Sequence, residues 1–237
     1  MNHEHEVRHL TEIDRRKFLQ LSGLATGLAF ANSILSLDSA TALATAKLPG
    51  FTAFAKSVKV FKGDKYYLVE SNGIPAHQMM VGIKSWQQQV PTVQNYSGTN
   101  AWSIPIKPVI AANPMSARDH FLRGAIAIAV NGVPIFNALN NRGDDALLAG
   151  ELDDWGGHCG RADDYHYHIA PTHLQTIVGK KVPIAYALDG FPIYGETEVD
   201  GKKVIGLDVF NGHFDSKKNY HYHATKNYPY INGGFKG

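Results

Sequence analysis

The tetrapeptide Tyr-His-Tyr-His occurs twice in this chain, and each copy follows a Gly-His step at the same distance. The first copy runs from Gly157-His158 through six residues to Tyr165–His168, and the second from Gly212-His213 through six residues to Tyr220–His223. The copies are therefore 55 residues apart, since 212 − 157 = 55. Self-similarity at a fixed period indicates a duplicated structural unit, and two copies favour one pseudo-symmetric domain, because a solenoid needs three or more repeats.

Similar turns precede both copies. Asn131-Gly132-Val133-Pro134 stands before the first copy and Asp189-Gly190-Phe191-Pro192 before the second. An Asn-Gly or Asp-Gly step tolerates positive φ, and the later proline fixes the exit of the chain. We therefore place the internal repeats at about residues 131–168 and 189–223. The turns are read first as turns, and their functional alternative is that they bring neighbouring strands to one site.

The remaining pattern predicts a mainly β fold. Hydrophobic residues make up 44% of the chain and charged residues 19%, a balance that fills a globular core. Alternating or β-branched apolar runs predict strands and hairpins at 58–71, 124–136, 182–195 and 196–208. One short helix is expected at 171–179, and irregular loops with short strands at 84–120. The predicted fold is a single β-sandwich-like domain over residues 45–237, with two pseudo-symmetric repeats of roughly 55 residues and a short helix.

Alternation along a strand makes the histidines candidate metal ligands. Side chains at i and i+2 share one face of a strand, about 7 Å apart at Cα, so His166 and His168 share one face and the two tyrosines the other. The Gly-His histidine adds a third imidazole from the preceding turn. The candidate ligands are His158, His166, His168, His213, His221 and His223.

These six imidazoles are compatible with several arrangements. They can form two three-histidine sites, or one four-histidine site if the two YHYH strands lie side by side, and we expect the shared site. Imidazole suits Zn, Cu, Fe and Ni, so the ligands indicate a divalent transition metal without selecting one. The structural alternative is a ladder of Tyr and His side chains that only fixes the packing of the repeats.

Other polar residues are weaker candidates. Cys159 adjoins a candidate ligand, but its repeat equivalent is Phe214, so we interpret it as a core residue. Asp163, Asp164 and Asp189 are candidates either for orienting imidazoles or for turns. The sequence offers no clear nucleophile or general base, although Asp189 is the best candidate base. Single histidines, such as His77 and His120, are expected at the surface, and the pair Met79-Met80 in the core.

The first 44 residues resemble a twin-arginine export signal. Arg15-Arg16 is followed by Phe18-Leu19, then by a mildly apolar stretch and by small residues that offer cleavage after Ala44 or Ala46. The resemblance implies recognition by the twin-arginine export machinery and a periplasmic protein. It also implies that no membrane span remains after cleavage. An uncleaved membrane anchor is the alternative. Net charge is +2, which gives no field that favours nucleic acid.

Together, the Gly-His…Tyr-His-Tyr-His motif, the segment 188–195 (LDGFPIYG) and the ending at 220–237 resemble the bacterial YHYH-domain proteins over about residues 124–237. The resemblance implies the domain and its export, but it does not supply a reaction. The sequence therefore favours an exported metal-binding protein with no reaction assigned. The alternatives are a metal-dependent hydrolase or oxidoreductase with an open three-histidine site, and a structural or interaction domain without metal.

Overall fold

A computed structural model describes residues 43–237, which belong to one compact unit. The predicted signal segment with Arg15-Arg16 lies outside the described residues, apart from its last two positions. Ala44 lies in the first strand, and the amide of Ala46 donates to the carbonyl of Val60 at 2.8 Å. Within the described part of the chain, no helix has the length and apolar character needed to cross a membrane.

The fold is mainly β, as predicted, and its first sheet has four antiparallel strands. They are ordered β1-β2-β3-β4, with bounds β1 Ala44–Thr45, β2 Lys59–Lys62, β3 Tyr66–Glu70 and β4 Trp102–Pro105. The predicted hairpin at 58–71 is confirmed, with its turn at Gly63-Asp64. Val60, Val69 and Ile104 are buried and join the core shared with the second sheet.

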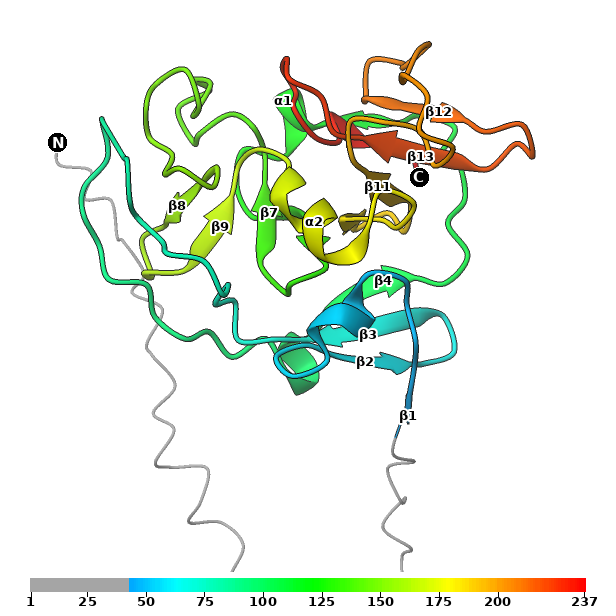
Figure 1. Ribbon diagram of the computed structural model, residues 1–237, viewed down its shortest axis with the longest axis horizontal. Helices are drawn as coiled ribbons and strands as arrows, with labels where there is room; N and C mark the ends of the chain where they lie inside the picture. The colour runs from blue at the N-terminus through cyan, green and yellow to red at the C-terminus, as the bar shows by residue number, and fades with distance from the viewer. Residues whose placement is uncertain (1–42) are drawn as a thin grey trace, which may run out of the picture. The chain divides into compact units, whose positions relative to one another are not determined.

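The second sheet has eight strands and carries both repeats (Figure 1). Its order is β12-β13-β11-β10-β6-β7-β9-β8. The strands are β6 Ala125–Ala129, β7 Pro134–Phe136, β8 Gly157–Cys159, β9 Tyr165–Tyr167, β10 Ala185–Ala187, β11 Pro192–Tyr194, β12 Gly212–Phe214 and β13 Tyr220–His223. The order reads as two equal halves, because β10, β11, β12 and β13 repeat the roles of β6, β7, β8 and β9.

A pseudo-two-fold axis passes between β6 and β10. Ile128 and Tyr186 are equivalent positions, since 186 − 128 = 58, and they are also paired across the antiparallel ladder. The same offset relates the isolated bridge Leu139–Asp145 to the bridge Thr197–Lys203. The later Gly-His positions are offset by 55, so the second repeat is three residues shorter between the bridge and β12. The duplication inferred from the motif therefore extends to the backbone of both halves.

The two YHYH strands are not neighbours, which contradicts the expected shared site. β9 pairs with β7 and β8, whereas β13 pairs with β11 and β12. Four strands separate them, and Figure 1 shows them in opposite halves of the sheet. The reason is that the central ladder is formed by β6 and β10, so the duplication places the later strands of each repeat outward.

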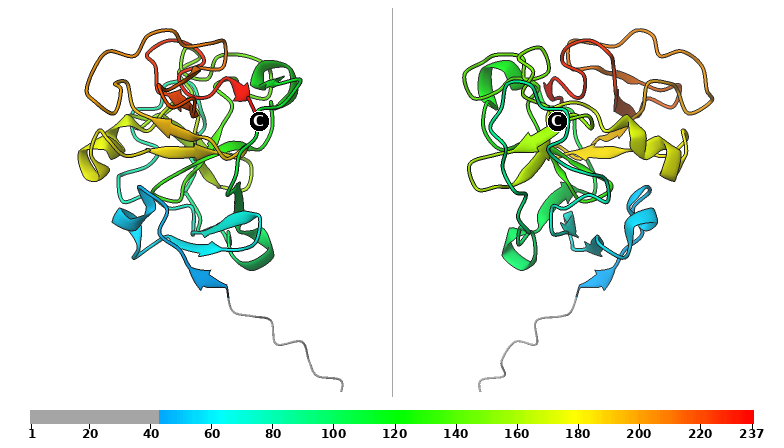
Figure 2. Two further views of the ribbon diagram at one scale, coloured as in Figure 1. Left: turned by 90° about the vertical axis from the view of Figure 1, so that its right-hand side faces the viewer. Right: turned by 60° about the vertical axis from the view of Figure 1, so that its left-hand side comes forward.

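Figure 2 shows the four-stranded sheet below the eight-stranded sheet in both views. The turns at Gly132 and Gly190, equivalent in the two repeats, both reach the four-stranded sheet. A Cβ on Gly132 would meet Cβ of Ser71 at 2.5 Å, and a Cβ on Gly190 would meet the carbonyl oxygen of Pro105 at 2.9 Å. Both glycines have positive φ, 83° and 99°. These turns therefore serve packing between sheets, and the histidine-bearing strands lie away from them.

The tyrosine face of each YHYH strand points into the core. Tyr165, Tyr167 and Tyr222 are among the largest fully buried side chains. The hydroxyl of Tyr165 donates to Asp153 at 2.8 Å, and that of Tyr220 donates to Asp208 at 3.0 Å. These bonds require the preceding glycine, because a Cβ on Gly157 would lie 2.6 Å from the Tyr165 hydroxyl oxygen. The Gly-His step and the YHYH step are thus parts of one packing unit.

The remaining elements are short. The predicted helix at 171–179 is confirmed as a 3-10 turn, Thr172–Leu174, continuing into α2, Gln175–Val178. The segment 84–120 contains β4, a 3-10 turn at Gly98–Asn100, β5 at Met115–Ser116 and a further helix, α1, at Ala117–His120. β5 pairs with β14, Gly234–Phe235. The predicted hairpin at 196–208 is reduced to a turn with one isolated bridge.

Gly157→Ala should destabilise the fold strongly. The new methyl group collides with the Tyr165 hydroxyl and with the backbone of His166, and overpacking of this kind costs about 1–3 kcal/mol. Urea unfolding monitored by circular dichroism measures the change in free energy of unfolding. Gly63→Ala is the matched control, because its nearest obstacle is one carbonyl oxygen at 3.3 Å. An equal, small effect of both substitutions would contradict this account of the Gly-His step.

Candidate functional site

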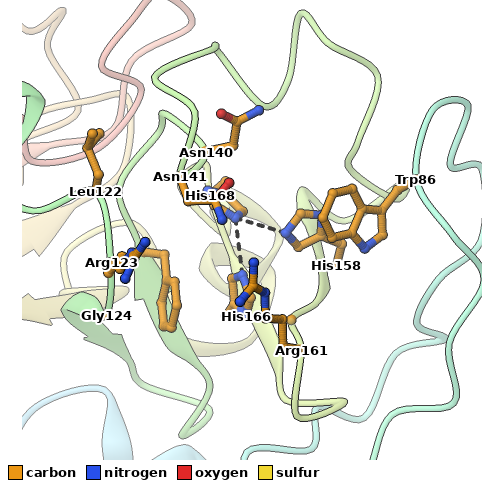
Figure 3. Close-up of a pocket in the computed structure, with 12 residues that line it drawn as sticks. Trp86, Leu122, Arg123, Gly124, Asn140, Asn141, His158, Arg161, His166 and His168 are labelled. Atoms are coloured by element: carbon orange, nitrogen blue, oxygen red, sulfur yellow. Dashed lines mark hydrogen bonds between the residues drawn. The ribbon is translucent and has the colours of Figure 1, made fainter.

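The first histidine cluster is built on the β8–β9 hairpin. His158 pairs directly with His166 across the antiparallel ladder, and His168 lies two residues further along on the same face. The Nε2 atoms of His166 and His168 are 3.1 Å apart, and those of His168 and His158 are 3.0 Å apart (Figure 3). All three side chains are buried. His158 thus comes from a strand, whereas the sequence had suggested a turn.

Each imidazole of this cluster is fixed by a bond from its other ring nitrogen to a backbone carbonyl. Nδ1 of His158 lies 3.0 Å from the carbonyl oxygen of Glu151, Nδ1 of His166 3.0 Å from that of Asp164, and Nδ1 of His168 2.5 Å from that of Asn137. A carbonyl oxygen can only accept, so each neutral ring carries its proton on Nδ1.

It follows that the three Nε2 atoms present lone pairs to one another. Two unprotonated nitrogens cannot hydrogen-bond to each other, and their separations of 3.0–3.1 Å leave the three lone pairs directed at a common point, where one cation would fit. Nitrogens bonded to one metal ion at about 2.0–2.1 Å lie about 3.0–3.4 Å from one another, which the observed separations match. Metal-ligating histidines usually donate their other ring N–H to a carbonyl or carboxylate in this way.

A second cluster occupies the equivalent position on the β12–β13 hairpin. His213 pairs with His221, and their Nε2 atoms are 3.1 Å apart. Nδ1 of His213 lies 3.0 Å from the carbonyl oxygen of Ile205, and Nδ1 of His223 2.8 Å from that of Gly195. Nε2 of His223 is buried without a hydrogen-bond partner among the described residues. The orientation of the first cluster is therefore reproduced for His213 and His223.

The second cluster contains a carboxylate that the first lacks. Oε1 of Glu198 lies 3.2 Å from Nε2 of His213, and Oε2 lies 3.6 Å from Nε2 of His223. All four side chains offer ligand atoms within 4.8 Å of one another. The equivalent of Glu198 in the first repeat is Asn140, since 198 − 140 = 58, and its amide nitrogen donates to Glu151 at 3.2 Å. Among the described residues, the first group is three histidines alone.

Aromatic side chains support the first cluster on two sides. Trp86 stacks on His158 with ring centroids 4.6 Å apart, and Phe136 stacks on His166 at 3.9 Å. The position equivalent to Phe136 is Tyr194, which meets His221 edge-on at 5.4 Å. Phe136 and Tyr194 could have been found from the 58-residue offset, whereas Trp86 lies outside the repeat and has no such signal.

The structure places the weaker candidates on the other face or in the core. Cys159 is fully buried, and burial raises the pKa of its thiol to about 12, in line with its interpretation as a core residue. Met80 is buried and accepts from the Cys159 amide at 3.2 Å. Asp189 accepts from the hydroxyl of Tyr222 at 2.5 Å, on the tyrosine face, so it is not placed as a base for the histidine clusters.

The other two predicted acceptors, Asp163 and Asp164, have different partners. The carboxylate of Asp163 accepts from Gln89 at 3.0 Å, while Asp164 contributes its backbone carbonyl to His166 and holds its carboxylate oxygen 3.7 Å from Nδ1. The expected surface position of His77 is wrong in part. Its Nε2 lies 2.6 Å from the Tyr167 hydroxyl, and its ring stacks on Trp155.

Burial lowers the pKa of four cluster histidines, His158, His168, His221 and His223, in the metal-free chain. The pKa of His158 is lowered to about 4, first by burial and then by the neighbouring His166. The pKa of His168 is lowered well below its ordinary value, by burial and by both neighbours. Burial also lowers the pKa of His221 and His223. A neutral imidazole is the form that binds metal, so low pKa values preserve ligand capacity at mildly acidic pH.

The metal-free protein should lose stability as the pH falls from about 6.5 toward 4. The unfolded chain binds a proton at His158 near its ordinary pKa, whereas the folded chain does not until pH 4. Above the unfolded pKa of 6.5, His158 is neutral in both states and the full free energy of unfolding is present. As the pH falls toward 4, protons bind the unfolded chain preferentially, and the free energy of unfolding decreases. Urea unfolding in chelator across this range checks it, with His158→Gln expected to show a shallower decline. Parallel curves for the two proteins would contradict the assignment.

Comparisons with known proteins agree with the family resemblance. Residues 101–203 match the family model described as YHYH protein. The match includes the first cluster and Glu198, but it ends before the three histidines of the second cluster. No curated protein and no solved structure matches the chain.

Proposed function

We propose that this chain, which carries a YHYH-family domain over residues 101–203, binds divalent transition metal ions at two separate sites. The first site is His158, His166 and His168, and the second is Glu198, His213, His221 and His223. The ions are drawn from the metals that suit imidazole, namely Zn, Cu, Fe and Ni. The second donor set is harder because it includes a carboxylate, so the two sites differ in metal preference.

The observation that carries this proposal is the fixed direction of the imidazole rings. Backbone carbonyls hold the Nδ1 protons of the first trio, and three Nε2 lone pairs then converge within a buried space. A purely structural Tyr/His ladder gives no reason for this convergence, since buried nitrogens without a partner cost free energy. A metal ion removes that cost at both sites.

A metal-dependent enzyme is the second candidate function. Three protein ligands leave coordination positions open at the first site, as catalytic metals require. Within residues 43–237, however, no Asp or Glu lines the cavity beside this site. The metal-binding function therefore ranks above the enzymatic one, since no candidate general base faces the open side.

Removing either histidine pair should remove about half of the bound metal. His166→Ala/His168→Ala leaves the second site intact, and His221→Ala/His223→Ala leaves the first, because the two clusters lie in opposite halves of the sheet. Metal content after equilibrium dialysis, measured by elemental analysis, should fall from two ions to one in each variant and to none in the combination.

Two controls accompany this test. His120→Ala changes an exposed histidine on α1 and should retain both ions. Circular dichroism establishes that each variant is folded. Loss of both ions from either pair variant would show one shared centre. If the wild-type protein bound no metal after dialysis against each candidate metal, only the structural role of the histidines would remain.

We also propose that the N-terminal segment directs export to the periplasm through the twin-arginine machinery. The support is the sequence Arg15-Arg16 followed by Phe18-Leu19, the mildly apolar run and the small residues before Ala46. This route carries a folded protein, so the buried sites can take up metal before export. Structural zinc-type sites of this kind contribute folding free energy when the ion binds.

Replacing both arginines by lysine should block export. The change preserves charge but removes the arginine pair, so unprocessed protein should accumulate in the cytoplasm. Cell fractionation with immunoblotting measures processing and location, and the wild-type chain in the same host is the control. Normal processing and periplasmic location of the Arg15→Lys/Arg16→Lys variant would contradict the proposed route.

A further inference from the structure

A cavity opens directly onto the first cluster. It has a volume of about 250 Å³ and is bounded on one side by His158, His166 and His168. This space corresponds to about eight water molecules at roughly 30 Å³ each. Trp86 and Phe136, which stack on two of the imidazoles, form apolar walls. The cavity therefore has room for a small organic molecule at the open side of the metal site.

Two arginines stand at this cavity (Figure 3). Arg123 precedes β6 and Arg161 lies in the β8–β9 turn, so separate segments bring them to one place. Both are exposed, and neither forms an ion pair with any carboxylate in residues 43–237. With a divalent ion on the histidines, the cavity has three positive groups and no negative one in its described lining.

The second site indicates which chemical group would balance this positive charge. There, Glu198 places a carboxylate against the imidazoles, whereas the equivalent Asn140 in the first repeat is neutral and is bonded to Glu151. The positions equivalent to Arg123 and Arg161 are Lys181 and Ser216, since 181 − 123 = 58 and 216 − 161 = 55. One site thus has an internal carboxylate, and the other has two arginines beside its imidazoles instead.

We propose that the cavity of the first site binds a small organic carboxylate, which completes the coordination of the metal as Glu198 does at the second site. This inference rests on the proposed metal-binding function. One carboxylate oxygen takes an open coordination position, and the arginines bind the carboxylate group by charge-assisted hydrogen bonds. The apolar part of the ligand lies against Trp86 and Phe136.

The apolar walls favour an organic acid over an inorganic anion. A fully hydrated phosphate gains nothing from burial against an indole or a phenyl ring, whereas an aromatic or branched aliphatic acid removes apolar surface from water. Small-molecule sites commonly combine apolar walls with a few charged groups that fix orientation. The ligand class is therefore a monocarboxylate with an apolar body, and benzoate is a suitable probe.

The test uses cobalt, because the visible absorption of Co²⁺ changes when a coordination position is filled. The His221→Ala/His223→Ala variant, loaded with one Co²⁺ at the first site, is titrated with benzoate. We expect a saturable spectral change, and no such change with neutral benzamide. Arg123→Gln and Arg161→Gln in this background should each weaken benzoate binding about tenfold at unchanged cobalt content. Lys181→Gln, the matched change in the other repeat, should leave it unaltered.

The outcomes separate the two proposals. Absence of both cobalt and zinc from the variant that retains the first site overturns the proposed metal binding at that site. Cobalt binding with no response to benzoate overturns the carboxylate proposal alone, as does equal binding by the arginine variants. Inorganic phosphate that binds as tightly as benzoate shows an unselective anion site and contradicts the assigned ligand class. A benzoate response in the cobalt-loaded His166→Ala/His168→Ala variant places the ligand at the wrong site.

Discussion

The fold depends on the different roles of the two faces of each YHYH strand: one face packs into the core, and the other carries the histidines. In β9 and β13, the tyrosines enter the core and bond to Asp153, Asp208, Asn131 or Asp189. The histidines on the other face are thereby fixed in height and spacing, because the strand cannot rotate without breaking the tyrosine bonds. The packing of the core and the direction of the imidazoles are therefore one constraint, and the tetrapeptide encodes both.

The two repeats keep this constraint but differ around it. Backbone positions with positive φ recur in both, such as Gly156 with Asn211 and Asp163 with Lys218. What differs is the outer surroundings of the imidazoles, where Glu198 replaces Asn140 and the first repeat alone adds Trp86. The same arrangement of three histidines is therefore combined with a carboxylate from the chain at the second site and with a cavity lined by two arginines at the first.

The sequence predicted the mainly β fold, the hairpin near 63, the strand and turn at 124–136, the helix near 175 and the three-histidine spacing that recurs in both groups. These features depend on local periodicity and on spacing within one strand. The pairing of β9 and β13 was predicted wrongly, because the motif says nothing of which strands form the centre of a sheet. Glu198 was missed because its partner across the repeat is Asn140, so identity between the copies, which revealed the histidines, gave no signal there. Asp153 and Asp208 were detectable, since Leu-Asp precedes the Gly-His step in both copies.

The antiparallel pair of β6 and β10 has a consequence for the origin of the chain. Ile128 and Tyr186 face each other across a local two-fold axis, so the two halves pair through equivalent strand edges. A surface of this kind is isologous, which is the geometry of a homodimer interface. A single repeat folded alone would expose that edge strand and would pair with its own copy, as unprotected edges do. Joining two such subunits in one polypeptide holds them together at any concentration, and it also frees each half to change its metal site without changing the other.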